Sequence, residues 1–257
     1  MTRTLFLAST ALTMLPVQVF AQSNQRIQRK DSITVSAGIP KEQLALEDQL
    51  DGILSQGDQF LKAGNESDAI KEYLLAVELV KKEPLLAGKD YWVHKRLADG
   101  YMRSKRPNDA IPIYERLLDV REPDCQPDSP TRLACADAQL DLAKADILAG
   151  NFSDATPLLQ AADSRYAASE KSAEKSSVDS HEFSMIQVKN QGQTKLLIAA
   201  ALYRTGKTQE ALATVEAAIS ELTRVQSDEA IQVFIRDEAG RSLQQAQTVV
   251  TRWKSTP

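Results

Sequence analysis

The chain has 257 residues, of which 42% are apolar, 26% are charged and 5% are aromatic. These fractions are those of a globular protein and argue against a disordered, collagenous or polytopic membrane chain. The formal net charge of −4 gives no electrostatic reason to bind nucleic acid or anionic lipid. Abundant Ala, Leu, Gln, Glu and Lys, with only ten Gly and ten Pro, favour helices over a β-sandwich or barrel.

Residues 1–21 have the pattern of a secretory signal peptide. Arg3 provides a positive charge, an apolar stretch follows, and small Ala21 precedes a cleavage site at Ala21–Gln22. An uncleaved membrane anchor is the alternative, but the apolar run is short for a bilayer and contains Pro16. We therefore predict a cleaved signal peptide, a periplasmic or secreted protein, and no membrane span after cleavage.

Residues 22–46 are polar apart from a short Ile-Thr-Val-Ser-Ala-Gly run, and they contain Pro40. Such a segment lacks the apolar periodicity of a packed helix. We predict a linker here, followed by a helical repeat domain at 47–223.

Four short segments share a sequence that ends one helix and starts the next. A glycine suits the left-handed residue that closes a helix, and Asn, Ser or Thr then caps the following helix. Asp or Glu in the first turn complements the helix dipole. In the second segment Lys105 takes the place of glycine and Pro107 is the helix breaker. Each segment ends in an alanine, and these are Ala69, Ala110, Ala155 and Ala211.

The same spacing of small and large residues returns on both sides of each turn. Before the turns, a small residue is followed three positions later by a larger one: Gly57 and Phe60, Ala98 and Tyr101, Ala143 and Asp146, Ala199 and Leu202. After the turns, positions four and seven beyond the shared alanine continue one helix face: Tyr73 and Ala76, Tyr114 and Leu117, Leu159 and Ala162, Val215 and Ala218. Small residues allow two antiparallel helices to approach closely, and such a hairpin must stack on neighbours to bury its apolar face.

These positions resemble the tetratricopeptide repeat (TPR) family. The match is best in the second repeat, through Leu97, Ala98, Tyr101, Ala110, Tyr114 and Pro123. The shared alanines are 41, 45 and 56 residues apart, whereas the family repeat is 34 residues long. The additional residues fall at 83–89, 122–129 and 167–180, the last of which is rich in Ser, Lys and Glu and predicts a helix extension or a flexible insert. The resemblance implies an all-α, irregular TPR-like α-solenoid of about four helix hairpins.

Residues 224–257 are predicted to form a long C-terminal capping helix with an amphipathic stripe that ends at Trp253. Solenoids need a terminal cap with one polar face. A homodimer through this helix is the alternative, because Trp253 and the nearby valines could also face a partner.

The two cysteines, Cys125 and Cys135, are close in sequence within a turn-rich connection. In an oxidising compartment such a pair most simply forms a disulfide. A zinc site would need four ligands at short spacing, and the two histidines, His94 and His181, are far from the pair. We predict a structural disulfide and no metal.

Catalytic motifs are missing from the sequence. Neither phosphate-binding glycine loop nor a G-x-S-x-G elbow occurs, and His181–Glu182 lacks the second histidine of a metalloprotease helix because Met185 stands there. We therefore predict a protein that is not an enzyme and binds no cofactor.

The resemblance implies that the first helix of each hairpin lines a concave groove for a protein or peptide. Trp92 and Tyr203 are aromatic anchors of the type that dominates interface energetics, although Trp92 could instead pack beneath Leu85–Leu86. Lys95, Lys144 and Arg204 are expected to bind an acidic or carboxylate group of the partner. The predicted function is an exported scaffold or adaptor, and the alternative is a non-catalytic subunit or enzyme component of a cell-envelope complex. The candidate groove residues are Trp92, Lys95, Asp99, Lys144, Tyr203 and Arg204.

Overall fold

A computed structural model describes residues 40–126, 129, 131–173 and 180–255. The chain divides into residues 1–41 and a helical unit of residues 42–257. The predicted signal peptide and most of the predicted linker lie outside the described residues. The first helix begins at Lys41, so the predicted linker is helical over 41–46.

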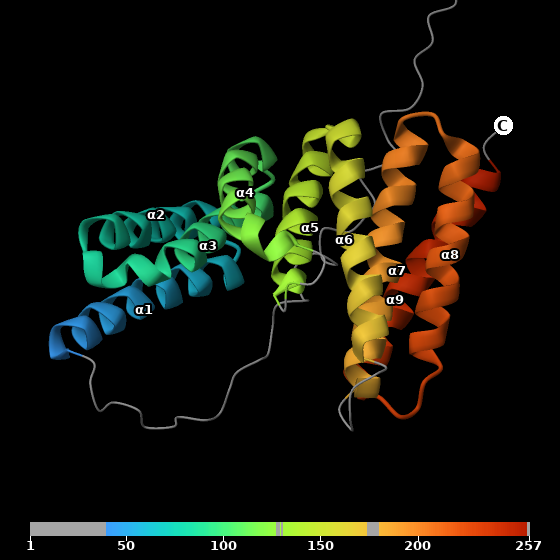
Figure 1. The fold of residues 1–257 in the computed structure, drawn as a ribbon. Coiled ribbons are helices and arrows are strands. Elements are labelled where there is room, and N and C mark those ends of the chain that lie inside the picture. The colour runs from blue at the N-terminus through green and yellow to red at the C-terminus, as the bar shows by residue number, and fades with distance from the viewer. Residues whose placement is uncertain (1–39, 127–128, 130, 174–179, 256–257) are drawn as a thin grey trace, which may run out of the picture. The chain divides into compact units, whose positions relative to one another are not determined.

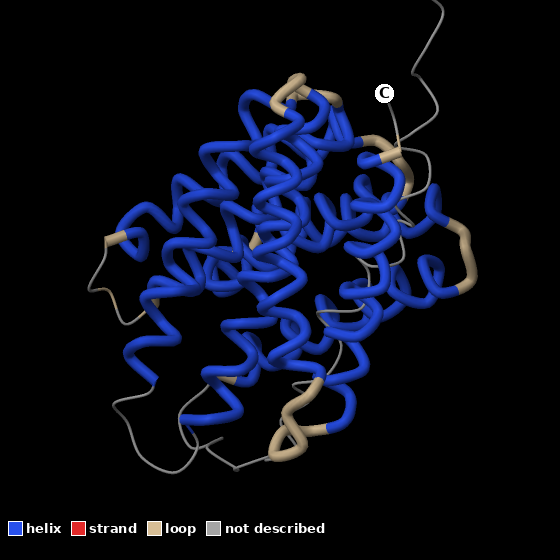
Figure 2. The backbone as a smooth tube through the Cα atoms, turned by 90° about the vertical axis from the view of Figure 1, so that its right-hand side faces the viewer, coloured by secondary structure: helices blue, strands red, loops and turns tan. Residues whose placement is uncertain are grey.

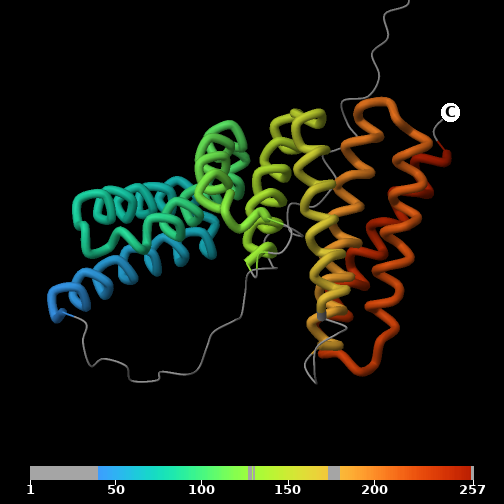
Figure 3. The backbone as a smooth tube through the Cα atoms, in the orientation of Figure 1, coloured from blue at the N-terminus to red at the C-terminus, as the bar shows by residue number. Residues whose placement is uncertain are grey.

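The described residues form nine α-helices and two short 3-10 helices, with no strand among them (Figures 1 and 2). Consecutive helices make four hairpins, α1/α2, α3/α4, α5/α6 and α7/α8, followed by α9, and the main packing contacts join neighbours along the chain (Figure 3). The prediction of an all-α solenoid with four hairpins is confirmed. The bounds are α1 Lys41–Lys62, α2 Glu66–Lys82, η2 Pro84–Lys89, α3 Asp90–Arg103, α4 Pro107–Arg121, η3 Glu122–Cys125, α5 Arg132–Ala149, α6 Phe152–Ala173, α7 Ser180–Arg204, α8 Thr208–Gln226 and α9 Val233–Lys254.

The four predicted turns, each joining the two helices of one hairpin and called corners below, have the same backbone geometry. A left-handed residue closes the first helix of each hairpin: Gly64 at φ 76°, Lys105 at φ 56°, Gly150 at φ 91° and Gly206 at φ 82°. The next backbone N–H then reaches back to a carbonyl of the last helical turn, which satisfies an otherwise unpaired acceptor. These bonds are Asn65 to Phe60 at 2.8 Å, Arg106 to Tyr101 at 2.9 Å, Asn151 to Asp146 at 2.8 Å and Lys207 to Leu202 at 2.9 Å.

Side-chain capping at the corners is less regular than the sequence predicts. Asn65 caps α2 by accepting from the Asp68 backbone N–H at 3.5 Å. The residues before α4 and α8 are Arg106 and Lys207, and neither makes a side-chain cap. The predicted Thr cap at the fourth corner is therefore absent, and backbone bonds alone close the second and fourth corners.

The shared alanines sit where the hairpin helices touch. Ala69, Ala110, Ala155 and Ala211 are all completely buried. Close approach also explains Gly57, since a Cβ added there would lie 2.6 Å from the Tyr73 ring. The predicted packing of small residues against large ones is confirmed in the first hairpin.

The insertions between repeats take two forms. The first two are the 3-10 helices η2 and η3. The third lengthens α6 to Ala173, so the predicted helix extension is confirmed over 167–173, while residues 174–179 lie outside the described part of the chain.

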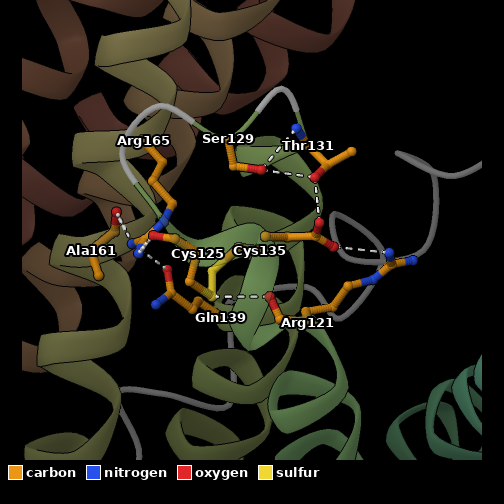
Figure 4. The surroundings of a disulfide bond; sticks show 9 residues. Arg121, Cys125, Ser129, Thr131, Cys135, Gln139, Ala161 and Arg165 are labelled. Carbon is orange, nitrogen blue, oxygen red and sulfur yellow. Dashed lines mark hydrogen bonds and ion pairs between the residues drawn. A yellow bond between two sulfur atoms is a disulfide. The ribbon is translucent and has the colours of Figure 1, made fainter.

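The cysteines form the predicted disulfide, which ties η3 to the first turn of α5 (Figure 4). Arg165 of α6 strengthens this junction because its guanidinium donates to the Cys125 carbonyl at 2.7 Å and to the Gln139 side-chain oxygen at 3.0 Å. On the other side of η3, Asp124 accepts from Arg121 at 3.1 Å and from the Thr131 hydroxyl. The disulfide and its neighbours therefore hold the second and third hairpins together.

The last helix begins at Val233, so residues 224–232 are not part of it as predicted, and 224–226 form the end of α8. It runs parallel to α7, because contacts between the two helices advance in the same direction along both. These are Gln232 with Glu182 at 2.8 Å, Glu238 with Lys189 at 2.8 Å, Ser242 with Gln193 at 3.1 Å, and Trp253 stacked on Tyr203 at 4.2 Å. Helix α9 thus takes the place of the first helix of a further hairpin.

Candidate interaction surface

Three helices, α1, α3 and α5, contribute polar side chains to a surface that we call the α1–α3–α5 face. It is formed by residues 51–58, 92–99 and 137–144. Helices α1 and α3 lie side by side, whereas α5 lies at a wide angle to them (Figure 1). Ion pairs join them, with Asp58 of α1 at 2.5 Å from Arg96 of α3, and Lys95 of α3 at 2.6 Å from Asp141 of α5.

The second helix of each of these hairpins supports the face from behind through a tyrosine. The three hydroxyls donate to aspartates of the first helices: Tyr73 to Asp58 at 2.6 Å, Tyr114 to Asp99 at 2.6 Å, and Tyr166 to Asp137 at 2.7 Å. The three tyrosines are buried. Burial is the first cause that raises the pKa of each, and the neighbouring carboxylates add to it, so all three remain neutral donors. The hydroxyls fix the aspartates in place.

Lys95 is the centre of an ion-pair cluster between α3 and α5. Its ammonium lies 2.6 Å from Asp141 and 3.2 Å from Asp99. Burial alone would lower the pKa of Lys95, but the charges of Asp141 and Asp99 outweigh it and raise that pKa. Burial would likewise raise the pKa of Asp141, yet Lys95 and Lys144 hold it below its ordinary value. Both shifts favour the charged forms of Lys95 and Asp141 at neutral pH.

Lys95 and Lys144, two of the predicted groove cations, are engaged within the chain. The side chains of Lys95 and Lys144 are only 14% and 16% exposed, and both lie against Asp141. An acidic group of a partner would therefore compete with carboxylates of the chain that already hold these lysines. The signal for this was present in the sequence, since Asp137, Asp141 and Lys144 recur at the spacing of one helix face.

Trp92 lies at the start of α3 and is 59% exposed. Tyr91 contacts it edge-on at 5.4 Å between ring centroids, and the Arg121 guanidinium lies 4.2 Å from the Tyr91 ring. The alternative in which Trp92 packs beneath Leu85–Leu86 is wrong, because Leu86 fills that core position and is completely buried.

The remaining predicted residues lie in the C-terminal part of the helical unit. Tyr203 stacks on Trp253 of α9, with the ring planes 2° apart. The Arg204 guanidinium lies 4.9 Å from the Phe152 ring of α6. Both side chains are used within the chain, and the structure does not bring them to the cluster around Lys95.

The described residues contain no group of three or more His, Cys, Asp or Glu side chains placed to hold a metal ion. In the same part of the chain, no helix is long and apolar enough to cross a bilayer. The arrangement therefore offers an exposed aromatic side chain, Trp92, on the same helix as Lys95, whose charge is held in place by ion pairs.

Comparison with known proteins identifies the fold. No family model and no curated protein matches the chain. Among solved structures, a crystal structure of a point variant of nearly identical TPR-like repeats from Podosopora anserina aligns with a TM-score of 0.52 and 17% sequence identity, covering 80% of this chain and 93% of that one. A second structure of such repeats from the same organism aligns with a TM-score of 0.39 and 16% identity, over 70% of this chain and 98% of the other. The first likeness and the four hairpins show a TPR-like repeat fold.

Proposed function

We propose that this chain is a non-catalytic scaffold that binds a partner protein or peptide on the α1–α3–α5 face. The observation that carries the proposal is the 59% exposure of Trp92 beside charges that are already ordered. Exposed aromatic side chains of this kind are the usual anchors of protein interfaces. Groups fixed before binding lose little conformational entropy when a partner arrives. The TPR-like fold supports protein interaction in general, and the exposed Trp92 indicates where on the fold the partner would bind.

The proposed location is the periplasm or the outside of the cell. The signal-peptide pattern at residues 1–21 supports export. The Cys125–Cys135 disulfide is compatible with an oxidising compartment. Expression of the full chain in a bacterial host, followed by N-terminal sequencing of the periplasmic fraction, tests this, and we expect a mature protein that starts at Gln22.

Site-specific photo-crosslinking in the native envelope tests the binding face. A photoreactive amino acid is placed at Trp92 in one variant and at Leu75 in a control variant. Leu75 is a suitable control because it is an apolar side chain on α2 with a similar exposure of 56%. We expect a discrete crosslinked product from position 92 and none from position 75.

An alanine substitution of Trp92 tests the anchor itself, with the photoreactive group moved to another position. Truncation of an interface anchor costs about 2 kcal/mol, or roughly thirtyfold in affinity. Trp92→Ala should therefore strongly reduce recovery of the crosslinked partner when the reactive group stands at Arg96, which is exposed and lies one turn after Trp92 on the same side of α3. Recovery unchanged by Trp92→Ala would exclude this face as the binding site.

A second candidate function is that of a subunit in a larger envelope assembly. It is favoured by further exposed apolar side chains at the starts of α7 and α9, namely Phe183 at 41%, Val233 at 59% and Phe234 at 61%. The two helix starts are joined by the Glu182–Gln232 hydrogen bond at 2.8 Å. A crosslink from position 234, with a product different from that at position 92, would indicate a subunit with two contacts.

A further inference from the structure

The 3-10 helix η3, between the second and third hairpins, is held by tethers rather than by burial. It is four residues long, it has no side-chain cap, and none of its residues is buried. Short 3-10 segments of this kind have little stability of their own. Two tethers meet at its last residue, Cys125, which is bonded to Cys135 of α5 and whose carbonyl accepts from Arg165 of α6 at 2.7 Å. The disulfide is the covalent one, so the position of η3 depends on the redox state of the cysteines.

Arg121 connects η3 to the start of α3. It is the last residue of α4, and its guanidinium donates to Asp124 of η3 at 3.1 Å. The same guanidinium lies 4.2 Å from the centroid of the Tyr91 ring. A carboxylate that holds a guanidinium over an aromatic ring fixes the direction of both side chains. Arg121 therefore joins η3 to Tyr91.

Tyr91 in turn supports Trp92. The two rings pack edge to face, with 5.4 Å between their centroids and 84° between their planes. Trp92 is exposed, and an exposed side chain that a neighbouring ring holds on one side has less conformational entropy to lose when a partner binds. A continuous series of contacts thus runs from the disulfide through η3, Arg121 and Tyr91 to the proposed anchor.

We propose that the Cys125–Cys135 disulfide is a redox switch for the binding face. While the disulfide is intact, η3 supports Trp92 through Arg121 and Tyr91. Once it is reduced, Trp92 loses this support, has to be ordered during binding, and holds the partner more weakly. This inference rests on the proposed function and adds its regulation.

The chemistry of the switch is thiol–disulfide exchange with a dithiol reductant. Cys125 is partly exposed and Cys135 is completely buried, so Cys125 is the one that a thiolate can approach. A bond forms between the reductant and the Cys125 sulfur, the bond between the cysteines breaks, and Cys135 leaves as a thiolate that takes up a proton. The second thiol of the reductant then attacks the mixed disulfide and releases Cys125. The protein gains two electrons and two protons, and the reductant becomes a disulfide.

Reduction is expected to act at this junction without separating the hairpins. The second and third hairpins also meet through a buried apolar cluster that contains Tyr114 and Leu117 of α4 and Leu142 of α5. Neither cysteine and no residue of η3 belongs to this cluster. What reduction releases is therefore η3 and the contacts that η3 makes.

The two tryptophans of the chain report on the switch. Trp92 and Trp253 are its two indoles, so a nitrogen-15 spectrum of the protein shows two indole N–H signals. Trp253, which stacks on Tyr203, is the internal control. Spectra are recorded for the oxidised protein and after reduction with dithiothreitol. We expect reduction to shift or broaden the Trp92 signal and to leave the Trp253 signal unchanged.

Arginine variants test the route from the disulfide to Trp92. Arg121→Ala removes the link while the disulfide stays intact, so its oxidised spectrum should already show the changed Trp92 signal, and reduction should change it little further. The matched control is Arg106→Ala. Arg106 makes the same kinds of contact at the start of α4, because it pairs with Asp109 at 2.7 Å and lies 4.7 Å from the Tyr101 ring. In this variant the Trp92 signal should respond to reduction as in the unsubstituted protein.

Crosslinking from position 96 gives the effect on binding. Reduction should lower recovery of the partner roughly fivefold, the effect of one interface side chain that must be ordered during binding. A Cys125→Ser/Cys135→Ser variant should behave like the reduced protein and should not respond to dithiothreitol.

The outcomes separate this inference from the proposed function. The switch is overturned by a Trp92 signal that ignores reduction, by an equal change at Trp253, or by a response to reduction that persists in full in Arg121→Ala. If one of these results occurs while position 92 still crosslinks a protein in the envelope, the scaffold function stands and the disulfide is only structural. If the Trp92 signal responds as expected but position 92 captures nothing, the coupling of the disulfide to Trp92 stands and the scaffold function fails.

Discussion

At the scale of single residues, the packing of the first two hairpins depends on the Tyr73 ring. The ring passes between α1 and α3, where Gly57 and Gly100 leave room for it. A Cβ at Gly57 would lie 2.6 Å from the ring, and one at Gly100 would lie 3.1 Å from it. The Tyr73 hydroxyl meanwhile donates to Asp58 on the α1–α3–α5 face. The same side chain therefore links the core to the candidate site.

We expect Gly57→Ala to destabilise the protein. The added methyl group overpacks the site, which costs about 1–3 kcal/mol, and the better helix propensity of alanine returns only about 0.5–1 kcal/mol. The control is Gly52→Ala in the same helix, where a Cβ would meet nothing within 4 Å. That substitution should stabilise the protein by about 0.5–1 kcal/mol. Urea unfolding followed by circular dichroism distinguishes the two, and a stable Gly57→Ala variant would contradict the assigned packing.

Asp146 is a buried carboxylate at a position where the other repeats have a large side chain. It is 6% exposed and accepts from the Asn151 side chain at 3.2 Å. Burial is the main cause that raises its pKa, and the charges of Asp154 and Glu115 add to it. Because the pKa is higher in the folded than in the unfolded chain, the ionised group opposes folding. Stability is thus lost as the pH rises from the unfolded value through the folded one.

Asp146→Asn should therefore raise the stability at pH 7. Asparagine can still accept the Asn151 bond, and we expect a gain of about 0.5–1 kcal/mol, the scale of one buried polar interaction. The gain should shrink as the pH is lowered, because Asp146 of the unsubstituted chain takes up a proton and its raised pKa then no longer opposes folding. Thermal unfolding at pH 7 and pH 3.5 measures both effects. Asp119→Asn, on an exposed side of α4, is the control and should change little; a loss of stability in Asp146→Asn at pH 7 would refute the argument.

At the scale of the elements, each hairpin depends on its corner, and the second corner is strained. Lys105 holds φ 56°, whereas the other three corners have glycine. The left-handed conformation costs a residue with a side chain about 1 kcal/mol. Nothing in the described contacts of Lys105 compensates for this.

We therefore expect Lys105→Gly to stabilise the protein by somewhat less than 1 kcal/mol, because glycine also gains entropy in the unfolded chain. The reciprocal change, Gly206→Ala at the fourth corner, should destabilise it by about 1 kcal/mol. Chemical denaturation of both variants tests the pair. If neither substitution changed the free energy of unfolding, the left-handed residue at these corners would not limit stability.

The corners also show which parts of the fold the sequence could predict. Glycine is required by the left-handed backbone of the turn, and the shared alanine by the close contact of the two helices. Both requirements are visible in the sequence, which therefore located all four corners and their hairpins. Capping was less predictable, because a backbone hydrogen bond replaces the side-chain cap at Arg106 and Lys207. The start of α1 was missed because its first turns, from Lys41, are mostly exposed and carry little apolar periodicity.

The candidate site was predictable only in part, for a physical reason. Position within a repeat correctly placed Trp92, Lys95 and Asp99 on the first helix of their hairpin. Whether a cation is free depends on its cross-helix neighbours, and the Lys95–Asp141 pair spans two repeats of unequal length. The pairing of Tyr203 with Trp253 was missed for the same reason, since it depends on the register of α9 against α7.

At the scale of the whole helical unit, α9 determines how the array of hairpins ends. It covers an apolar cluster on α7 and α8 with Ile235, Ala239 and Leu243, which are buried. Its other side carries exposed polar residues: Asp237, Arg241, Gln244, Gln247 and Thr248. Trp253 and Val250, the residues considered for a dimer interface, pack within the chain. Helix α9 therefore has the properties of a solenoid cap.

The cap and the dimer helix make opposite predictions for a chain that ends at Ser227. If α9 is a cap, its removal uncovers Met185, Val188, Leu222 and Val225, and the truncated protein should associate or bind a hydrophobic dye. If α9 joined two copies, the truncated protein would instead become a smaller, monomeric particle. Light scattering of the mature and truncated chains distinguishes these results. A point variant avoids truncation: Ile235→Ala should cost about 2–4 kcal/mol, whereas Gln244→Ala on the polar side should leave stability and particle size unchanged.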